Sequence, residues 1–292
     1  MTDPIRGFWV ATPTPLSADG SVDHVRLTHH VLQLFAKSAD GVVLFGTTGE
    51  GTSFGAAERL ATVESLLKAG IAESRIGLGS GFAAVTDSIA LTRSALALGL
   101  RHVLMLPPYF YRDATAEGIE DAFAAILDGV ADDRLRATLY HIPQTSGVGV
   151  PPSVAARLRA RYGAVVAGLK DSSADFKQFQ AFRAAAPELA ITVGNEVDIA
   201  RAVARGGAGT ICGLGNIVPH LIRAMLDVGA ESQMRAVQSV FADEPFTPAL
   251  KAVLAARSGH AGWLRVRPPL RAASNGVALT AKLDSLLRPV AA

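Results

Sequence analysis

Short apolar runs alternate with longer amphipathic segments along most of the chain. Each run is rich in Val, Ile and Leu and ends near a glycine or a proline. This pattern is typical of parallel strands that are buried on both faces. We expect strands at Gly7–Thr12, Gly41–Gly46, Ile76–Ser80, His102–Leu106, Ala137–Ile142, Val165–Lys170, Ala190–Gly194 and Gly209–Gly213.

A helical segment follows each of these runs. Proline suits the first turn of a helix, as at Pro152 and Pro219, and glycine suits the position after the last turn, as at Gly70 and Gly99. The expected helices are Val22–Lys37, Ala56–Gly70, Thr86–Leu98, Glu117–Ala131, Pro152–Tyr162, Asp175–Ala186, Val197–Arg205 and Pro219–Val228.

The strands begin about 20–35 residues apart, which is one strand-helix unit each, and a run of such units predicts a (β/α)8 TIM barrel. The alternative is a doubly wound open sheet. The segment Gly79–Ala84 (GSGFAA) has the outline of a dinucleotide-binding turn. A strand-end acid is expected about 20 residues later, but Arg101 stands there. We therefore expect no nucleotide cofactor.

Residues 231–292 read as a helical extension, with helices at Ser232–Asp243, Pro248–Ser258 and Val277–Leu287. No Gly/Ser-rich linker separates them from the barrel. We expect a catalytic barrel domain over residues 1–230 and a C-terminal helical extension over residues 231–292. Arg265 and Arg267 are expected to tie the extension to the barrel or to an interface.

Composition excludes several classes of protein. The chain has 292 residues, 49% hydrophobic and 18% charged, with a formal charge of +2. Disorder is excluded, and Cys212 as the single cysteine excludes internal disulfides and cysteine-based zinc sites. We find no basic block and no long apolar run, so we expect no nucleic-acid binding, no membrane span and no secretory signal. The expected location is the cytoplasm.

The sixth expected strand ends in Lys170. Alternation along a strand places Val166, Gly168 and Lys170 on one face. On the inner face, Lys170 would stand at the mouth of an apolar barrel, where burial favours the neutral amine that can attack a ketone and form a Schiff base. The alternative is a lysine that extends from the strand end to solvent.

Two further motifs fall at strand ends. Tyr140 on the fifth strand could carry protons, or it could be a core tyrosine with a satisfied hydroxyl. The GTTGEG segment at 46–51 could offer backbone amides and hydroxyls to a carboxylate, or it could be an ordinary tight turn. Together with Lys170 they supply a nucleophile, a proton carrier and an anion cradle, which a 2-oxo acid such as pyruvate requires.

The chain resembles the pyruvate-dependent class I aldolases typified by dihydrodipicolinate synthase and N-acetylneuraminate lyase. The resemblance covers essentially the whole chain. It is carried by GTTGE at 46–50, PPY at Pro107–Tyr109, YHIP at Tyr140–Pro143, GLKDSS around Lys170, GNE at Gly194–Glu196 and GGAGTICGLGN at Gly206–Asn216. It implies a (β/α)8 barrel with a C-terminal helical extension, usually assembled as a homotetramer.

The resemblance also implies roles for individual residues. Lys170 would form the Schiff base, Tyr140 would be the acid/base phenol, and Thr47 would be its hydroxyl relay partner. The pyruvate carboxylate would be held by Thr48 and the neighbouring backbone, including Gly49.

Four more residues would surround the substrate. Gly194 and Ile211 would line the pocket beside the oxo acid. Asn195 and Glu196 would contact hydroxyls of the aldehyde half.

Two positions depart from the synthase pattern. Phe110 stands where dihydrodipicolinate synthases have a second tyrosine that is donated across a subunit interface, so the phenolic relay is interrupted unless Tyr109 or Tyr111 replaces it. Thr145 stands in place of the arginine that binds the carboxylate of the second substrate. A threonine cannot form a bidentate charged pair, so the sequence argues against the lysine-biosynthetic synthase.

We therefore predict a carbon–carbon lyase of the class I aldolase type that uses or releases pyruvate, with an aldehyde as the other partner. It would need only a covalent lysine Schiff base, without a cofactor or a metal. The strand-end acids Glu50, Asp171 and Glu196 are too dispersed for a metal site. The alternatives are a 4-hydroxy-tetrahydrodipicolinate synthase, a 2-oxo-3-deoxy sugar acid aldolase or dehydratase, and a non-catalytic barrel that binds oxo acids.

Overall fold

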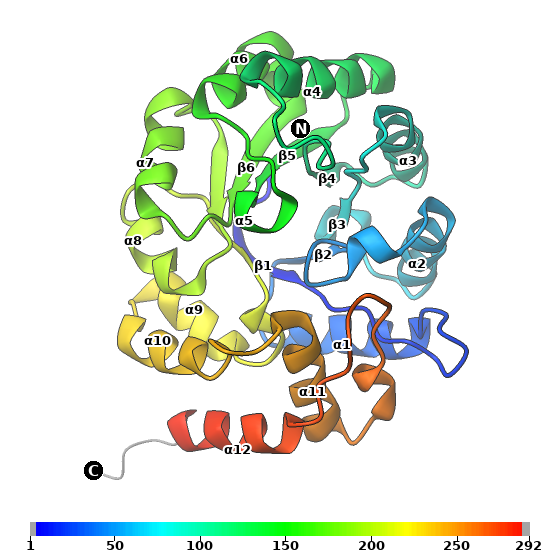
Figure 1. The fold of residues 1–292 in the computed structure, drawn as a ribbon, viewed down its shortest axis with the longest axis vertical. Helices are drawn as coiled ribbons and strands as arrows, with labels where there is room; N and C mark the ends of the chain where they lie inside the picture. Colours follow the sequence, from blue (N-terminus) through cyan, green and yellow to red (C-terminus); the bar gives the residue numbers. More distant parts are fainter. Residues whose placement is uncertain (1–3, 288–292) are drawn as a thin grey trace.

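The computed structural model describes residues 4–287 and contains a closed barrel of parallel strands in the order β1 to β8 (Figure 1). The closed order confirms the predicted barrel and excludes the open sheet. The strands are β1 (Gly7–Ala11), β2 (Gly41–Leu44), β3 (Ile76–Gly79), β4 (His102–Met105), β5 (Arg136–His141), β6 (Val166–Asp171), β7 (Ala190–Val193) and β8 (Gly209–Cys212).

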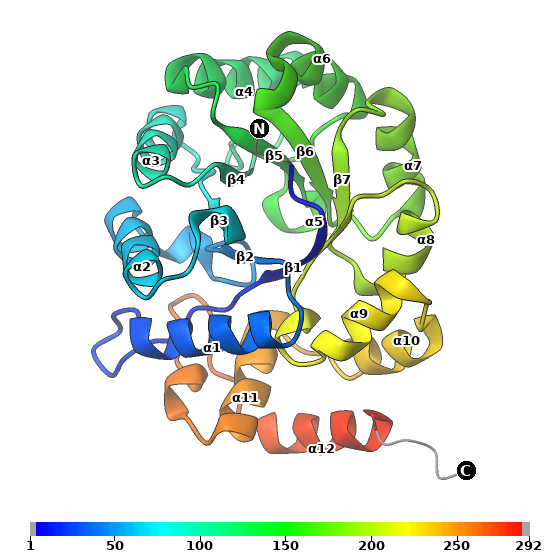
Figure 2. The ribbon, with the colours of Figure 1, turned by 180° about the vertical axis from the view of Figure 1, so that it is seen from behind.

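Helices surround the strands on the outside of the barrel, as the front and back views show (Figures 1 and 2). Those of the barrel are α1 (His24–Ala36), α2 (Ala56–Lys68), α3 (Val85–Ala97), α4 (Ala116–Val130), α5 (Pro143–Ser146), α6 (Pro152–Tyr162), α7 (Phe176–Ala185), α8 (Ile199–Val203) and α9 (Pro219–Asp227). Short 3-10 turns are η1 (Gly51–Ser53), η2 (Glu73–Arg75), η3 (Gly163–Val165), η4 (Glu196–Asp198) and η5 (Leu214–Asn216).

The strand boundaries agree with the sequence-based expectation to within about two residues. Pro152 and Pro219 do begin helices, and the side chain of Asp175 caps α7 by accepting a hydrogen bond from the amide of Lys177. The short helix α5 was not expected from the sequence. It begins at Pro143 and ends at Ser146, and the next residue, Gly147, has a φ of 74°, which suits a glycine.

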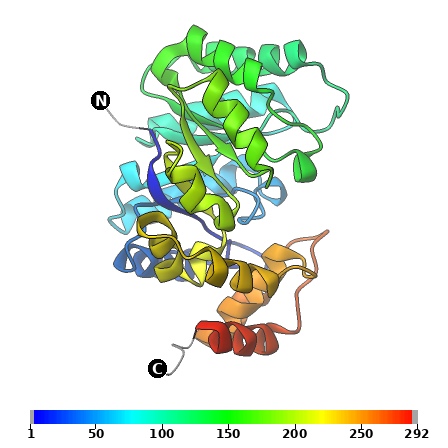
Figure 3. The same cartoon turned by 90° about the vertical axis from the view of Figure 1, so that its left-hand side faces the viewer.

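The extension consists of α10 (Glu231–Ser239), α11 (Phe246–Ser258), η6 (Ala261–Leu264) and α12 (Gly276–Leu287). Figure 3 shows α11 and α12 in orange and red at the end of the molecule opposite α4 and α6. Helix α10 ends four residues earlier than the predicted Asp243, because Phe241 turns away to pack against Phe246, with ring centroids 5.8 Å apart. The division of the chain at residue 230 remains a prediction.

Two arginines bind the extension to the barrel, as the sequence predicts. The guanidinium of Arg265 donates to the carbonyl of Leu16, at 3.0 Å. That of Arg267 donates to the carbonyls of Gly20 and Ser53. It also forms an ion pair with Glu58.

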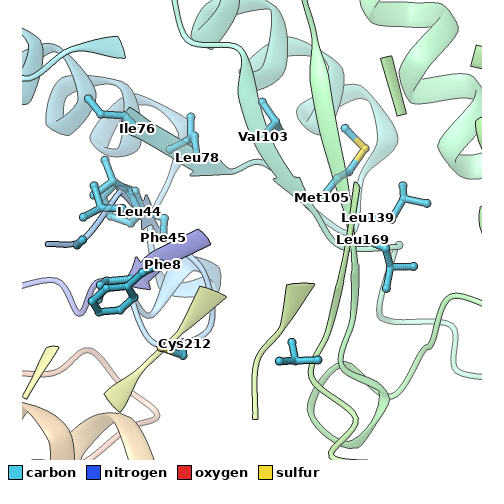
Figure 4. Close-up of a cluster of buried hydrophobic side chains, with 14 of the residues drawn as sticks. Phe8, Leu44, Phe45, Ile76, Leu78, Val103, Met105, Leu139, Leu169 and Cys212 are labelled. Carbon is cyan, nitrogen blue, oxygen red and sulfur yellow. The ribbon is translucent and has the colours of Figure 1, made fainter. Parts of the chain in front are cut away.

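The strands bury both faces. Outward side chains such as Phe8, Leu78 and Met105 pack in the layer between strands and helices (Figure 4). Inside the barrel, the indole of Trp9 fills the lower part, which is the end at which the strands begin. A Cβ on Gly41 would lie 2.6 Å from that indole, so this position has room only for glycine. The upper part, where the strands end, is left open for a site.

A register shift separates the two ends of the β5–β6 pair. Ala137 pairs with Val166, but Thr138 pairs with Gly168. The extra residue in β6 is a β-bulge, which re-aims the side chains that follow it. As a result Tyr140 lies directly opposite Lys170, where an unshifted ladder would have placed it opposite Leu169.

Among residues 4–287, no helix combines the length and the apolar character needed to cross a lipid bilayer.

Candidate active site

Lys170 lies inside the upper end of the barrel. Its side chain leaves β6 on the inner face, and the residue is only 4% exposed. The Nζ atom lies 4.4 Å from the centroid of the Tyr140 ring. A Cβ on Gly194 would lie 3.2 Å from the Cε of Lys170, so the missing side chain of Gly194 leaves room for the lysine. Lys170 therefore does not extend to solvent.

Tyr140 lies between the lysine and the turn that follows β2. The residue is buried, and its hydroxyl lies 3.2 Å from Oγ1 of Thr47, so either oxygen can donate. Lysine amine, phenol and threonine hydroxyl thus come from β6, β5 and the turn after β2. This is the arrangement that the sequence predicts. A proton can move along the hydrogen bond between Tyr140 and Thr47, and the lysine amine lies against the Tyr140 ring.

The turn at 46–51 exposes two amides at the end of the site. The amides of Gly49 and Gly51 both donate to the carbonyl of Gly46, at 3.0 Å. Within residues 4–287, the amides of Thr47 and Thr48 donate to no protein group. Thr47 and Thr48 line the cavity, whereas the amide of Gly49 is used within the turn. The two threonines, more than Gly49, can therefore receive a carboxylate.

A cavity of about 710 Å³ opens above Lys170. It has room for a substrate larger than pyruvate. The cavity is lined by Thr47, Thr48, Tyr140, Ile142, Gln144, Thr145, Lys170, Ser172, Ala174, Gly194, Asn195, Glu196, Ile211, Gly213, Leu214, Arg235, Gln238, Ser239, Phe241, Ala242 and Phe246. All the predicted site residues except Gly49 are thus brought together around one space.

Glu196 is buried beside this cavity and is held by the backbone. Its Oε1 accepts hydrogen bonds from the amides of Gly213 and Leu214, at 3.1 and 2.9 Å. Burial raises the pKa of the Glu196 carboxyl, while these amides and the charge of Lys170 oppose the rise. One carboxylate oxygen therefore fixes the loop after β8, and only the other is left for a substrate.

The side-chain amide of Asn195 is engaged on both sides. Its nitrogen donates to Asp198 at 2.7 Å, and its oxygen accepts from the amide of Gln238 at 2.7 Å. The hydroxyl contact that the resemblance implies for Asn195 would have to displace or share one of these bonds. Gln238 of α10, beside it, also lines the cavity.

The extension supplies lining residues that sequence analysis missed. Arg235, Gln238 and Ser239 come from α10, and Phe246 from α11. Arg235 forms no ion pair within residues 4–287. No local motif marks these positions, because they reach the site only when the extension packs against the barrel.

A second cavity of about 530 Å³ adjoins the first and shares Thr47, Tyr140, Ile142 and Thr145 with it. Tyr109, Phe110 and Arg112 line it as well. Phe110 is 77% exposed and stacks edge-on with the equally outward Tyr111, at 5.4 Å. Among residues 4–287, the hydroxyls of Tyr109 and Tyr111 form no hydrogen bond with Thr47 or Tyr140, so neither extends the Thr47–Tyr140 path.

Neighbouring polar residues on β5 and β6 point away from the lysine. Nδ1 of His141 accepts a hydrogen bond from the amide of Val150, and burial lowers the pKa of this histidine. Asp171 accepts from the amide of Ser173, and burial raises its pKa. In the described part of the chain, His, Cys, Asp and Glu side chains form no group of three that could hold a metal ion.

Comparison with known proteins gives relatives over nearly the full length. The chain is 37% identical to an uncharacterised DapA-like lyase of Chloroflexus aurantiacus, over 87% of both chains. It is 32% identical to the 4-hydroxy-tetrahydrodipicolinate synthase of an Anaeromyxobacter strain, over 77% of this chain and 73% of that one. The crystal structure of dihydrodipicolinate synthase from Agrobacterium tumefaciens superposes with a TM-score of 0.93, with 32% identity over 97% of this chain and 100% of that one. The model of the dihydrodipicolinate synthetase family matches residues 4–263. The chain therefore belongs to the dihydrodipicolinate synthetase family.

Proposed function

We propose that this protein is a class I lyase that forms a Schiff base with a 2-oxo acid and uses or releases pyruvate. The observation that carries the proposal is the buried Lys170 amine, 4.4 Å from the Tyr140 ring, with the Tyr140 hydroxyl 3.2 Å from Thr47. Membership of the dihydrodipicolinate synthetase family supports it.

In the cleavage direction, the neutral amine of Lys170 adds to the ketone carbon of a 4-hydroxy-2-oxo acid. Loss of water gives a protonated imine, which is an electron sink. The bond between C3 and C4 then breaks, and its electron pair becomes the C2=C3 double bond of an enamine. C4, which carries the hydroxyl, leaves as an aldehyde.

Tyr140 and Thr47 manage the protons of this reaction. The phenol oxygen of Tyr140 takes the proton of the departing hydroxyl while its own proton passes to Thr47, whose hydroxyl releases its proton to solvent in the cavity. The same relay in reverse returns a proton to the enamine carbon and regenerates the imine, and water then releases pyruvate and the free Lys170 amine. Condensation of pyruvate with an aldehyde is the same sequence reversed, and no step uses a metal or a dissociable cofactor.

The carboxylate of the oxo acid is assigned to the amides of Thr47 and Thr48 and to the Thr48 hydroxyl. Charge-assisted hydrogen bonds of this kind are about twice as strong as neutral ones. Holding the carboxylate at the β2 end orients the ketone carbon towards Lys170, with Gly194 and Ile211 packed beside it. Glu196 and Thr145 are assigned to the aldehyde half.

The 4-hydroxy-tetrahydrodipicolinate synthase activity is the second candidate, favoured by the 32% identical synthase relative. Thr145 argues against it, because this exposed threonine offers no positive charge to a second carboxylate. We also propose a cytoplasmic location and a homotetramer. The outward aromatic pair Phe110 and Tyr111 supports a contact between copies of the chain.

The test is reductive trapping. Incubation with pyruvate and borohydride should add the mass of reduced pyruvate to the peptide that contains Lys170, and Lys170→Ala should abolish the adduct. Tyr162→Phe, a change outside the site, serves as the control and should trap normally. A folded wild-type protein that forms no adduct would refute Schiff-base chemistry.

A further inference from the structure

Glu50 and Lys251 form an ion pair inside the protein. Both side chains are fully buried, and Oε1 lies 2.6 Å from Nζ although the residues are 201 positions apart. Neither is among the residues that line the cavity of Lys170. Removing each ion from water costs several kcal/mol, and replacing such a pair by apolar residues is often neutral or stabilising. Stability alone therefore does not account for the pair.

The pair joins α11 to the turn that carries the site. The second oxygen of Glu50 accepts from the amide of Arg267, at 2.8 Å. Nζ of Lys251 also donates to the carbonyl of Thr14, and the Thr14 hydroxyl donates to the carbonyl of Gly49, each at 2.8 Å. The extension thus holds the turn at Gly49 and at Glu50.

The backbone of the turn needs such support. Glu50 adopts φ 57°, in the left-handed region. For a residue with a side chain, this costs about 1–2 kcal/mol. The same turn leaves the amides of Thr47 and Thr48 without a protein partner in the described residues. A turn that relaxed at Glu50 would carry these amides out of place.

We propose that the Glu50–Lys251 pair fixes the turn in the geometry that binds the oxo-acid carboxylate. Lys251 is then a positioning residue, and α11, which carries it, holds the carboxylate-binding turn of the active site in place. The inference rests on the proposed function, since it concerns the carboxylate of the same substrate. It predicts that a charge in the extension controls recognition of the carboxylate and leaves the Lys170 amine unaffected.

The test compares two ketones that differ in the carboxylate. The double variant Glu50→Gln/Lys251→Met removes both charges with little change of side-chain shape. Neither charge is left buried without its partner. Borohydride trapping is measured against the concentration of pyruvate and of acetone. We expect the half-saturating pyruvate concentration to rise about tenfold, or about 1.4 kcal/mol, and the acetone rate to change less than about twofold.

Asp284→Asn is the matched control. It removes the Arg257–Asp284 pair, which joins α11 to α12 without touching the turn. This variant should keep the wild-type response to pyruvate. Equal losses with pyruvate and acetone in the double variant would mean general loosening of the barrel and would overturn the proposal.

Thr14→Val provides an independent test if the double variant fails to fold. It cuts the link to Gly49 without removing a charge. We expect about a threefold rise in half-saturating pyruvate, from the loss of one buried hydrogen bond, with acetone trapping unchanged. If a folded Thr14→Val or double variant binds pyruvate as the wild type does, this inference is overturned and the proposed function is not. If the wild-type protein forms no Lys170 adduct, the proposed function and the inference are both overturned.

Discussion

Tyr140→Phe separates the chemistry of the site from its packing. The substitution removes one hydroxyl and keeps the ring below Lys170, so the 4.4 Å contact with Nζ is retained. Within residues 4–287, the hydrogen bond that is lost is the 3.2 Å bond to Thr47. A hydrogen bond of this kind contributes about 1 kcal/mol to folding, so the variant should fold and melt almost as the wild type does.

The effect on the reaction should be much larger. A positioned general acid or base contributes about 10²–10⁴ in rate, which corresponds to about 3–5 kcal/mol of barrier. Loss of the phenol should therefore slow proton transfer by two orders of magnitude or more. Thr47→Val, which keeps the phenol and removes its partner, should cost about tenfold.

Exchange of the pyruvate methyl protons in deuterated water measures this step without knowledge of the aldehyde. The exchange requires the imine of Lys170 and a base that moves a proton to and from the methyl carbon, and proton NMR follows it directly. Lys170→Ala gives the background rate. A Tyr140→Phe variant that exchanges faster than about a tenth of the wild-type rate would refute the assigned role of the phenol.

Two further predictions concern specificity and acid stability. Thr145→Arg should raise turnover of pyruvate with aspartate semialdehyde by about tenfold or more, because the arginine can form one charged pair with the carboxylate of the semialdehyde. Thr145→Gln is the neutral control. Efficient turnover by the wild type would show that the argument from the missing arginine is wrong. Burial lowers the pKa of His30 and of His102 to about 4. The unfolded chain binds these protons below about pH 6.5. The contribution of these neutral histidines to the free energy of unfolding is therefore fully present above about pH 6.5 and is lost as the pH falls towards 4. The loss is about 2 kcal/mol for each histidine between pH 7 and pH 5. Urea unfolding should show this loss, and the loss should be smaller in His30→Gln. His260→Gln, a change at an exposed histidine, serves as the control.

Local chemistry explains what could be predicted of the fold. Buried strands, amphipathic helices and their proline and glycine boundaries are properties of neighbouring residues, so their order predicts the barrel. The same locality explains the misses. Pro143–Ser146 is too short to show a helical period, and α10 ends early because Phe241 packs against Phe246 across the turn.

The sequence alone determined that Lys170 and Tyr140 stand near strand ends and that a glycine-threonine turn follows the second strand. It did not determine that the two side chains meet. Their pairing depends on the register shift between Ala137 and Thr138, because a shift of one residue moves every later side chain to a different partner.

Tertiary structure also decided which parts of the extension belong to the site. Arg235 and Phe246 reach the cavity, and Lys251 reaches Glu50, only after the chain has closed the barrel and packed α10 and α11 against it. Contacts between residues 201 positions apart leave no local pattern in a single sequence. Their energy comes from burial and charge in the closed fold, where elements distant along the chain are brought within hydrogen-bonding distance.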